Sequence, residues 1–269
     1  MARSSIARIR GRLKEVGPGR LAVGGSAGLI LAGFLLGRLY LGIELPTTGL
    51  ATLAPGAGDR YQAGLARLQA GRAALSSRYA AAARTETERE HVLEEARSTF
   101  LEAVRADIFP YWYGTPWDFG GTTETPRGGG IACGYFVSTV LRDAGLRVER
   151  VRLAQQASEN IIRSLTGPDH IRRFSDVPID RFVETVQQWG DGLYVVGLDI
   201  HVGFLDVARG SVWFVHSSYQ LPYCVVREQA SRSRILSSSR YRVVGKISDD
   251  AALLRKWLGS ESFATHNEP

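Results

Sequence analysis

The stretch that decides the fold runs from Gly128 to Gly145 and reads GGGIACGYFVSTVLRDAG. After Cys133, apolar residues recur at the spacing of a helix, and Gly145 stands where a helix commonly ends. The pattern predicts a buried helix whose first residue, Cys133, faces a cleft. A helix N-terminus favours the thiolate, which is the nucleophilic form of cysteine. Cysteine is also commonly buried as an inert apolar side chain, so this stretch alone leaves both interpretations open.

The charge of the chain is concentrated at its beginning. The 269 residues have an ordinary hydrophobic content of 44% and a net charge of +6. Six basic residues against the single acidic Glu15 precede residue 21, and they supply most of this excess. The basicity therefore indicates membrane topology, and we expect no nucleic-acid partner.

Residues 21–43 are predicted to form a single transmembrane anchor. Leu21 to Gly37 is uncharged, and with Arg38 reaching toward the interface the apolar stretch extends to about 23 residues, enough to cross a bilayer. Basic residues precede it and Glu44 follows it, so the positive-inside rule places the N-terminus in the cytoplasm. We expect an inner (cytoplasmic) membrane protein whose main domain is periplasmic or extracellular. A cleavable signal peptide is the alternative, less favoured because the stretch is long and no A-x-A site follows.

The remaining chain divides by composition. Residues 1–20 form the basic cytoplasmic segment, and residues 44–59 are small, polar and interrupted by proline and glycine, as in a linker. Residues 60–109 predict a helical hairpin whose apolar stripe ends at Pro110. This hairpin can pack on the domain or contact a protein partner or a second copy. Residues 110–250 are assigned to the catalytic domain and 251–269 to a C-terminal helix with a polar tail that frays after Ser260.

Strand patterns follow Gly190. Five short segments are rich in β-branched and aromatic residues and separated by turn signals: 192–199, 201–207, 212–216, 223–227 and 241–247. The links between them are short, so the sheet should be antiparallel. The predicted fold class is α+β, with the cysteine-bearing helix packed on a five- to six-stranded antiparallel sheet.

Two histidines fall at matching ends of one predicted hairpin. His201 begins a strand and His216 ends the next, so an antiparallel pair places them side by side. A catalytic thiol needs a base within reach, and the base needs a third group to orient it. We assign these roles to Cys133, His201 and His216. Asp199 is the alternative orienter if the strand before His201 is regular.

At these residues the chain resembles the NlpC-type family of papain-like cell-wall cysteine peptidases. The matching residues are Trp117 to Gly121 (WDFGG), Cys133 with Gly134 and Phe136, His201 with Gly203 and Phe204, and His216. The resemblance covers about half of the chain, from Trp112 to Ile247.

The resemblance implies a papain-like fold and a Cys-His-polar triad. It also implies a hydrolase, a thiol protease that cleaves amide bonds in peptidoglycan stem peptides without a metal or other cofactor. Trp117, Asp118 and Gly121 are then candidates for the substrate groove, although the aromatic loop can also be a simple entry to the core. Ala132 and Gly134 flank the cysteine where the family usually has Asp and Ser, which leaves the bond that is cleaved open.

Other interpretations stay open. Cys133, His201, His216 and Asp199 are acceptable zinc ligands. The domain can also be an inactive wall-binding scaffold of the same fold, or a transglutaminase-like acyl transferase with a similar set of residues. A Cys133 to Cys224 disulfide is chemically allowed outside the cytoplasm, but Cys224 lies in an apolar run typical of a core.

Overall fold

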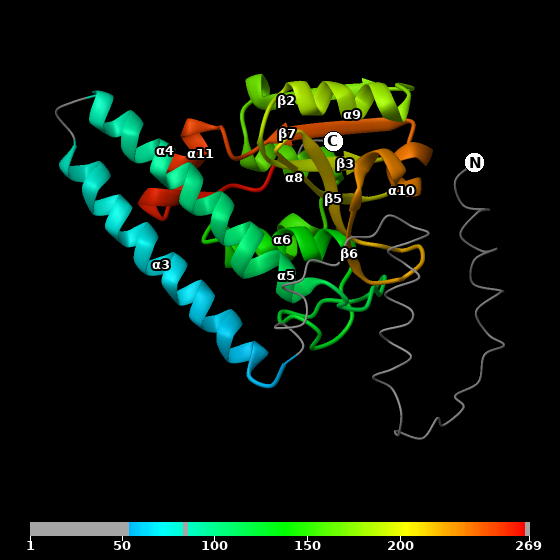
Figure 1. Cartoon of the computed structure of the whole chain (residues 1–269), viewed down its shortest axis with the longest axis horizontal. Coiled ribbons are helices and arrows are strands. Elements are labelled where there is room, and N and C mark those ends of the chain that lie inside the picture. Colours follow the sequence, from blue (N-terminus) through cyan, green and yellow to red (C-terminus); the bar gives the residue numbers. More distant parts are fainter. Residues whose placement is uncertain (1–53, 83–85, 267–269) are drawn as a thin grey trace.

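The computed structural model describes residues 54–82 and 86–266, which form an α+β domain with a long helical hairpin packed on it (Figure 1). The predicted membrane anchor at 21–43 and most of the predicted linker lie outside these residues. Within the described ranges, no helix combines the length and the apolar character needed to cross a membrane.

The hairpin consists of α3 (Ala57–Ala81) and α4 (Glu86–Glu102). Each helix buries one stripe: Tyr61, Gly64, Leu68 and Leu75 in α3, and Val92, Ala96, Phe100 and Leu101 in α4. The helical path then continues where the sequence predicts an end at Pro110. A π-helical segment, Ala103–Ile108, leads into α5 (Phe109–Trp112), and Pro110 lies in the first turn of α5. Proline is tolerated there because first-turn N–H groups have no intrahelical acceptor, so the predicted stop is wrong.

Helix α6 (Cys133–Asp143) begins at the cysteine. The residue before it, Ala132, is extended, and the turn after the helix places Gly145 at a φ of +92°, a left-handed conformation that favours glycine. The hydroxyl of Ser217 donates a hydrogen bond of 2.7 Å to the carbonyl of Ile131. The start of α6 is thereby fixed to the sheet.

Several short elements connect α6 to the central strands. They are β1 (Arg147–Val148), α7 (Arg150–Ala154), α8 (Ser158–Leu165), a 3₁₀ turn (Pro168–His170), β2 (Ile171–Ser175) and α9 (Ile179–Gln188). The sequence pattern does not predict β2, an edge strand in which Phe174 alone is buried.

The main sheet has six strands in the order β2-β7-β3-β4-β5-β6, and every neighbouring pair is antiparallel. The strands not yet given are β3 (Gly192–Leu198), β4 (Val202–Ala208), β5 (Ser211–Ser217), β6 (Val225–Gln229) and β7 (Tyr241–Lys246). The predicted α+β class and antiparallel sheet are confirmed.

Alternate residues of the strands enter two separate cores. Phe204 and Val215 belong to the core shared with α6 and the hairpin. Leu205 and Phe214 belong to the core beneath α9 and α10 (Arg234–Ser238). His216 is two residues from Phe214, so its side chain leaves β5 on the face of the second core, whereas Cys133 packs against the first core.

The C-terminal helix α11 (Ala251–Gly259) is capped by Asp250, whose carboxylate accepts hydrogen bonds from the N–H groups of Ala252 and Leu253. The chain then forms β8 (Ser262–Phe263), which pairs in parallel with β1. The expected fraying after Ser260 is wrong for these residues, because Phe263 is buried in the main core.

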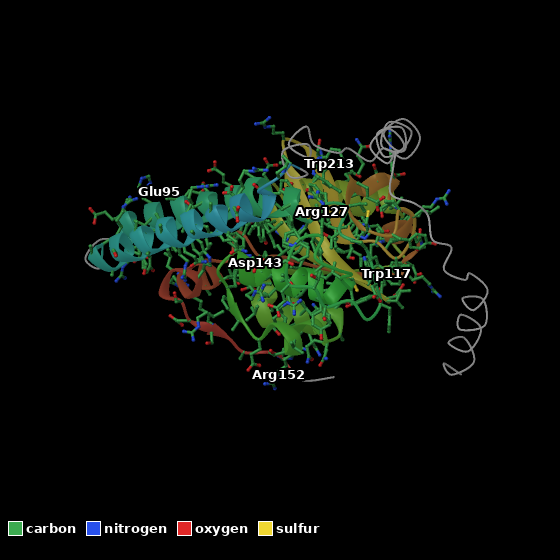
Figure 2. The ribbon with its side chains drawn as sticks, turned by 90° about the horizontal axis from the view of Figure 1, so that it is seen from below. Glu95, Trp117, Arg127, Asp143, Arg152 and Trp213 are labelled. Carbon is green, nitrogen blue, oxygen red and sulfur yellow. The ribbon has the colours of Figure 1, made fainter. Side chains whose placement is uncertain are left out.

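Polar side chains join the hairpin to the domain. The hydroxyl of Tyr61 donates to Asp143 at the end of α6 (2.6 Å) and accepts from the indole N–H of Trp112 (3.0 Å). Arg97 pairs with Asp249 near α11, and Arg105 pairs with Asp206 of β4. Figure 2 shows Asp143 beside the base of the hairpin and Glu95 toward its outer end. The hairpin is therefore a brace across α6, the sheet and α11.

Candidate active site

Cys133, the first residue of α6, is a partly buried free thiol. The backbone N–H groups of Val202, Gly134 and Cys133 itself act on this sulfur and lower the pKa of the thiol. Val202 is the first residue of β4 and directly follows His201. The sulfur therefore lies where the start of α6 meets the start of β4, next to the backbone that carries His201.

Burial controls the charge of this thiol. Desolvation raises the pKa of Cys133, and the three backbone N–H groups offset only part of that rise. Burial of Cys133 therefore outweighs the preference of a helix N-terminus for the thiolate. A nucleophile of this kind has to lose its proton during the attack, which requires a base beside it.

The two predicted histidines meet. His201 Nε2 and His216 Nδ1 are 3.0 Å apart, the rings are nearly perpendicular at 87°, and both side chains are buried. Burial lowers the pKa of His201 well below its ordinary value, and the charge of a protonated His216 lowers it further. Burial also lowers the pKa of His216, which stacks on Phe214 with ring centroids 3.9 Å apart. Both imidazoles are therefore neutral at pH 7.

Glu228 of β6 adds a fourth group. Its Oε1 is 3.2 Å from His216 Nε2. A carboxylate only accepts hydrogen bonds, so His216 Nε2 carries the proton and His216 Nδ1 accepts from His201 Nε2. This assignment leaves His201 Nδ1 unprotonated, as a general base requires. The hydrogen bond and the charge of Glu228 partly offset the effect of burial on the pKa of His216.

Asp199, the alternative orienter, has other partners. Its carboxylate accepts hydrogen bonds from the Ser239 hydroxyl and from the backbone N–H groups of Arg240 and Tyr241. Residues 199–201 form the bend between β3 and β4, so the chain is not a regular strand there. Of the two candidates for this role, the structure brings His216 to His201.

The aromatic loop reaches the same place. The backbone N–H of Trp117 donates to the carbonyl of Tyr223 (2.8 Å), and the centroid of the Trp117 ring lies 6.4 Å from that of the Tyr219 ring. The Tyr219 ring is in turn 5.2 Å from that of His201. Burial raises the pKa of Tyr219, and the negative charge of a Cys133 thiolate raises it further. Tyr219 thus borders the imidazole of His201, and Trp117 adjoins Tyr219.

The other two groove candidates have different places. Asp118 is exposed, and its Oδ1 accepts the N–H of Gly120 (2.9 Å). Gly121 is buried where a Cβ would lie 2.4 Å from the carbonyl carbon of Gly130. Gly121 therefore allows two backbone segments to meet ahead of Cys133 and offers no side chain to a substrate.

A small cavity of about 150 Å³ adjoins the histidine, lined by residues that include Ile200, His201, Tyr219, Ile235 and Ser238. A larger cavity of about 820 Å³ lies at the other end of α6, beside Gly145 and Arg147. Of the predicted site residues, His201 and Asp199 line the smaller cavity, and none lines the larger one.

The remaining alternatives concern the sulfur atoms and metals. Cys133 and Cys224 are both free thiols, and burial raises the pKa of Cys224 to about 11. In residues 54–82 and 86–266, no group of three or more His, Cys, Asp or Glu side chains is arranged to hold a metal ion.

Two site residues are not predicted from the sequence. Glu228 lies just beyond the predicted strand 223–227, although its spacing of two from Val226 places both on one face. Val226 pairs with His216 and Glu228 with Phe214, so the register of β5 and β6 is needed to find it. Tyr219 lies in the β5–β6 loop, where no periodicity guides a prediction.

Comparisons with known proteins add no relative: no family model, no curated protein and no solved structure matches this chain.

Proposed function

We propose that this protein is a membrane-anchored cysteine hydrolase that cleaves amide bonds in peptidoglycan peptides. The observation that carries the proposal is the chain of contacts from His201 through His216 to Glu228, with Cys133 placed at the start of α6 beside Val202, the residue that follows His201. The helix and antiparallel sheet agree with the papain-like arrangement that the resemblance implies. The substrate class rests on that resemblance and on the predicted position outside the inner membrane.

In the proposed reaction, His201 Nδ1 takes the proton of the Cys133 thiol as the sulfur attacks the amide carbonyl carbon. The S–C bond forms, and the imidazolium then gives its proton to the amine nitrogen as the C–N bond breaks. Water hydrolyses the thioester with His201 again as base, which restores the thiol. His216 holds the His201 ring, and Glu228 stabilises the positive charge that develops on the pair.

The buried surroundings favour a neutral resting pair. The pKa of Cys133 is raised and that of His201 is lowered, so separating charge between them at rest is unfavourable. The backbone N–H groups at the sulfur are placed to stabilise negative charge that appears during the attack. The N–H of Cys133 at the helix start is the candidate for one oxyanion donor.

The direct test removes the nucleophile. In the full chain, Cys133→Ala should lower release of peptides from purified peptidoglycan, read by mass, by on the order of 10⁴-fold or more. Cys224→Ala is the matched control, because Cys224 is also a partly buried free thiol but has no role in the proposed reaction, so turnover should stay nearly unchanged. Cleavage by Cys133→Ala at the wild-type rate would refute the proposal.

The same assay separates the alternatives. An inactive scaffold predicts no products from the wild-type protein, although Cys133 would still sit in its folded site. An acyl transferase predicts products that carry an added amine and appear only when an amine is supplied.

A further inference from the structure

We propose that the loops around the candidate active site dock onto an anionic lipid bilayer, so that the mouth of the site faces the membrane surface. Five large hydrophobic side chains are exposed among the described residues, and four come from three loops at this mouth. They are Phe119 (88% exposed), Ile200 (78%), Leu221 (77%) and Tyr223 (52%). These four residues are called the apolar rim.

The rim residues are neighbours in space although they are distant in sequence. Trp117, two residues before Phe119, donates its N–H to Tyr223 and places its ring beside Tyr219. Tyr219 lies against the ring of His201, which directly follows Ile200. The three loops therefore surround one opening.

The rim side chains are strongly exposed, and the cavities that Ile200 and Leu221 help to line are small. The cavity beside His201 measures about 150 Å³ and is lined in part by Asp199 and Ser238. Protruding apolar side chains of this kind enter a fluid apolar medium more readily than a shaped protein surface. Aromatic and aliphatic tips beside cationic residues are typical of proteins that lie in the membrane interface.

Cationic side chains lie next to one part of the rim. Arg232 and Arg234 are exposed and line the same shallow cavity as Leu221, together with the partly buried Glu228, and the exposed Asp118 directly precedes Phe119. Loop residues 218–224 carry no charged side chain. Each Arg close to an anionic membrane surface adds on the order of 1 kcal/mol of attraction.

The chain enters the domain next to the segment that leads into the aromatic loop. The start of α3 packs on the segment just ahead of the aromatic loop, since Tyr61 contacts Tyr111 and Trp112. Figure 1 shows this end of α3 beside the loops that precede α6. Residues 44–53 separate the predicted anchor from the first described residue and span at most about 35 Å when extended. The rim is therefore within reach of the bilayer that holds the predicted anchor. An enzyme placed in this way takes amide substrates that are held close to the membrane. This last step rests on the proposed function.

The test uses the full chain in vesicles of phosphatidylethanolamine and phosphatidylglycerol that contain brominated lipid. Phe119→Trp and Leu221→Trp each add a fluorophore to the rim, and the signal is the difference from wild type. The control is Ser77→Trp, an exposed position on α3 next to Arg78, whose partner Glu95 marks the outer end of the hairpin (Figure 2).

We expect brominated lipid to quench the rim tryptophans at least about twofold more than the one at position 77. This excess should shrink when phosphatidylcholine replaces phosphatidylglycerol, when salt is raised, and in the double variant Arg232→Ser with Arg234→Ser.

Two results would overturn the docking proposal. Equal quenching at all three positions, with equal access to aqueous acrylamide, would place the rim in water. Protection of the rim from both acrylamide and brominated lipid would place it against protein, as in contact with a second copy. Neither readout uses turnover. The hydrolase proposal can therefore fail in the Cys133→Ala assay while the docking proposal holds, and the docking proposal can fail while the hydrolase proposal holds.

Discussion

At the scale of single residues, the direction of proton transfer in the proposed reaction depends on one carboxylate. Glu228 accepts the proton of His216 Nε2, so His216 Nδ1 accepts from His201 Nε2 across 3.0 Å, and His201 Nδ1 is left unprotonated as the proposed base. Without Glu228 the imidazole pair has no group that selects one tautomer or balances its positive charge.

The first prediction concerns Glu228 as a positioning residue. Glu228→Ala should lower kcat/KM by on the order of 10²-fold, and Glu228→Gln by less, because its carbonyl oxygen still accepts from His216. Loss of the negative charge lowers the pKa of the histidine pair, so the acid limb of the pH profile moves to lower pH. Gln229→Ala is the neighbouring control. A uniform drop with an unmoved acid limb would assign Glu228 a merely structural role.

The second prediction follows from the neutral histidines. Their pKa values in the folded state lie below the ordinary 6.5, so the unfolded chain binds more protons once the pH falls through that value. Their contribution to stability is complete above pH 6.5 and declines below it, by up to about 1.4 kcal/mol per pH unit for each histidine. Denaturant unfolding at pH 7 and pH 5 measures this slope.

Variants isolate the histidine contribution to that slope. His201→Asn and His216→Asn should each reduce the loss of unfolding free energy between pH 7 and pH 5. Identical slopes in the wild type and in both variants would contradict the neutral assignment.

Residue types and spacing were sufficient to nominate Cys133, His201 and His216, because each stands at the end of a predicted element. They could not give the protonation of the thiol, which depends on burial created by the whole fold. Glu228 depends on strand register, and the role of Asp199 depends on an irregular bend. Interactions of these kinds leave little trace in local sequence.

At the scale of elements, the sulfur is positioned by the packing of α6 on α7. A Cβ at Gly134 would lie 2.2 Å from the carbonyl oxygen of Ala154 at the end of α7. Helix α6 therefore approaches α7 so closely at Gly134 that no side chain fits between the two backbones.

The third prediction is that Gly134→Ala destabilises the fold by about 1–3 kcal/mol, because α7 has to move away from α6. The displacement should also change the rate at which a thiol reagent labels Cys133, measured in a Cys224→Ala background. Gly167→Ala is the control, since nothing lies within 4 Å of the point that its added Cβ would occupy. Equal unfolding free energies for the two variants would show that α6 and α7 are not in such close contact.

Elements with strong periodicity were predictable, and weak ones were not. The strands β3, β4, β5 and β7 combine β-branched and aromatic residues over six or seven positions. Edge strand β2 alternates poorly, and β8 is only two residues long, so tertiary pairing alone creates them. The helix end predicted at Pro110 is wrong because the apolar stripe does not show that Pro110 falls in the first turn of a new helix.

At the scale of the whole molecule, one buried chain of hydrogen bonds joins the hairpin to α6. Trp112 donates to Tyr61, and Tyr61 donates to Asp143 in the last turn of α6. The end of α6 opposite Cys133 is thus held by the brace.

The fourth prediction is that Tyr61→Phe lowers the free energy of unfolding by about 1–3 kcal/mol, since it leaves the Trp112 N–H and an Asp143 oxygen without this partner. Tyr79→Phe in the same helix is the control, because its ring lies near Arg89 and is only partly buried. Hydrogen exchange should accelerate in α3 for the first variant alone. Unchanged exchange in α3 would show that apolar contacts are sufficient to hold the brace.

Gly134 and Gly203 lie near the site and form part of a sequence pattern by which other chains with the same set of residues can be sought. A methyl group at Gly203 would lie 2.8 Å from the Cβ of His216, just as one at Gly134 would strike Ala154. An added Cβ at either position requires its neighbours to move, so both positions disfavour any residue larger than glycine. A search for Cys-Gly, then His-x-Gly, then a histidine and a glutamate on successive strands would test whether other chains share this arrangement.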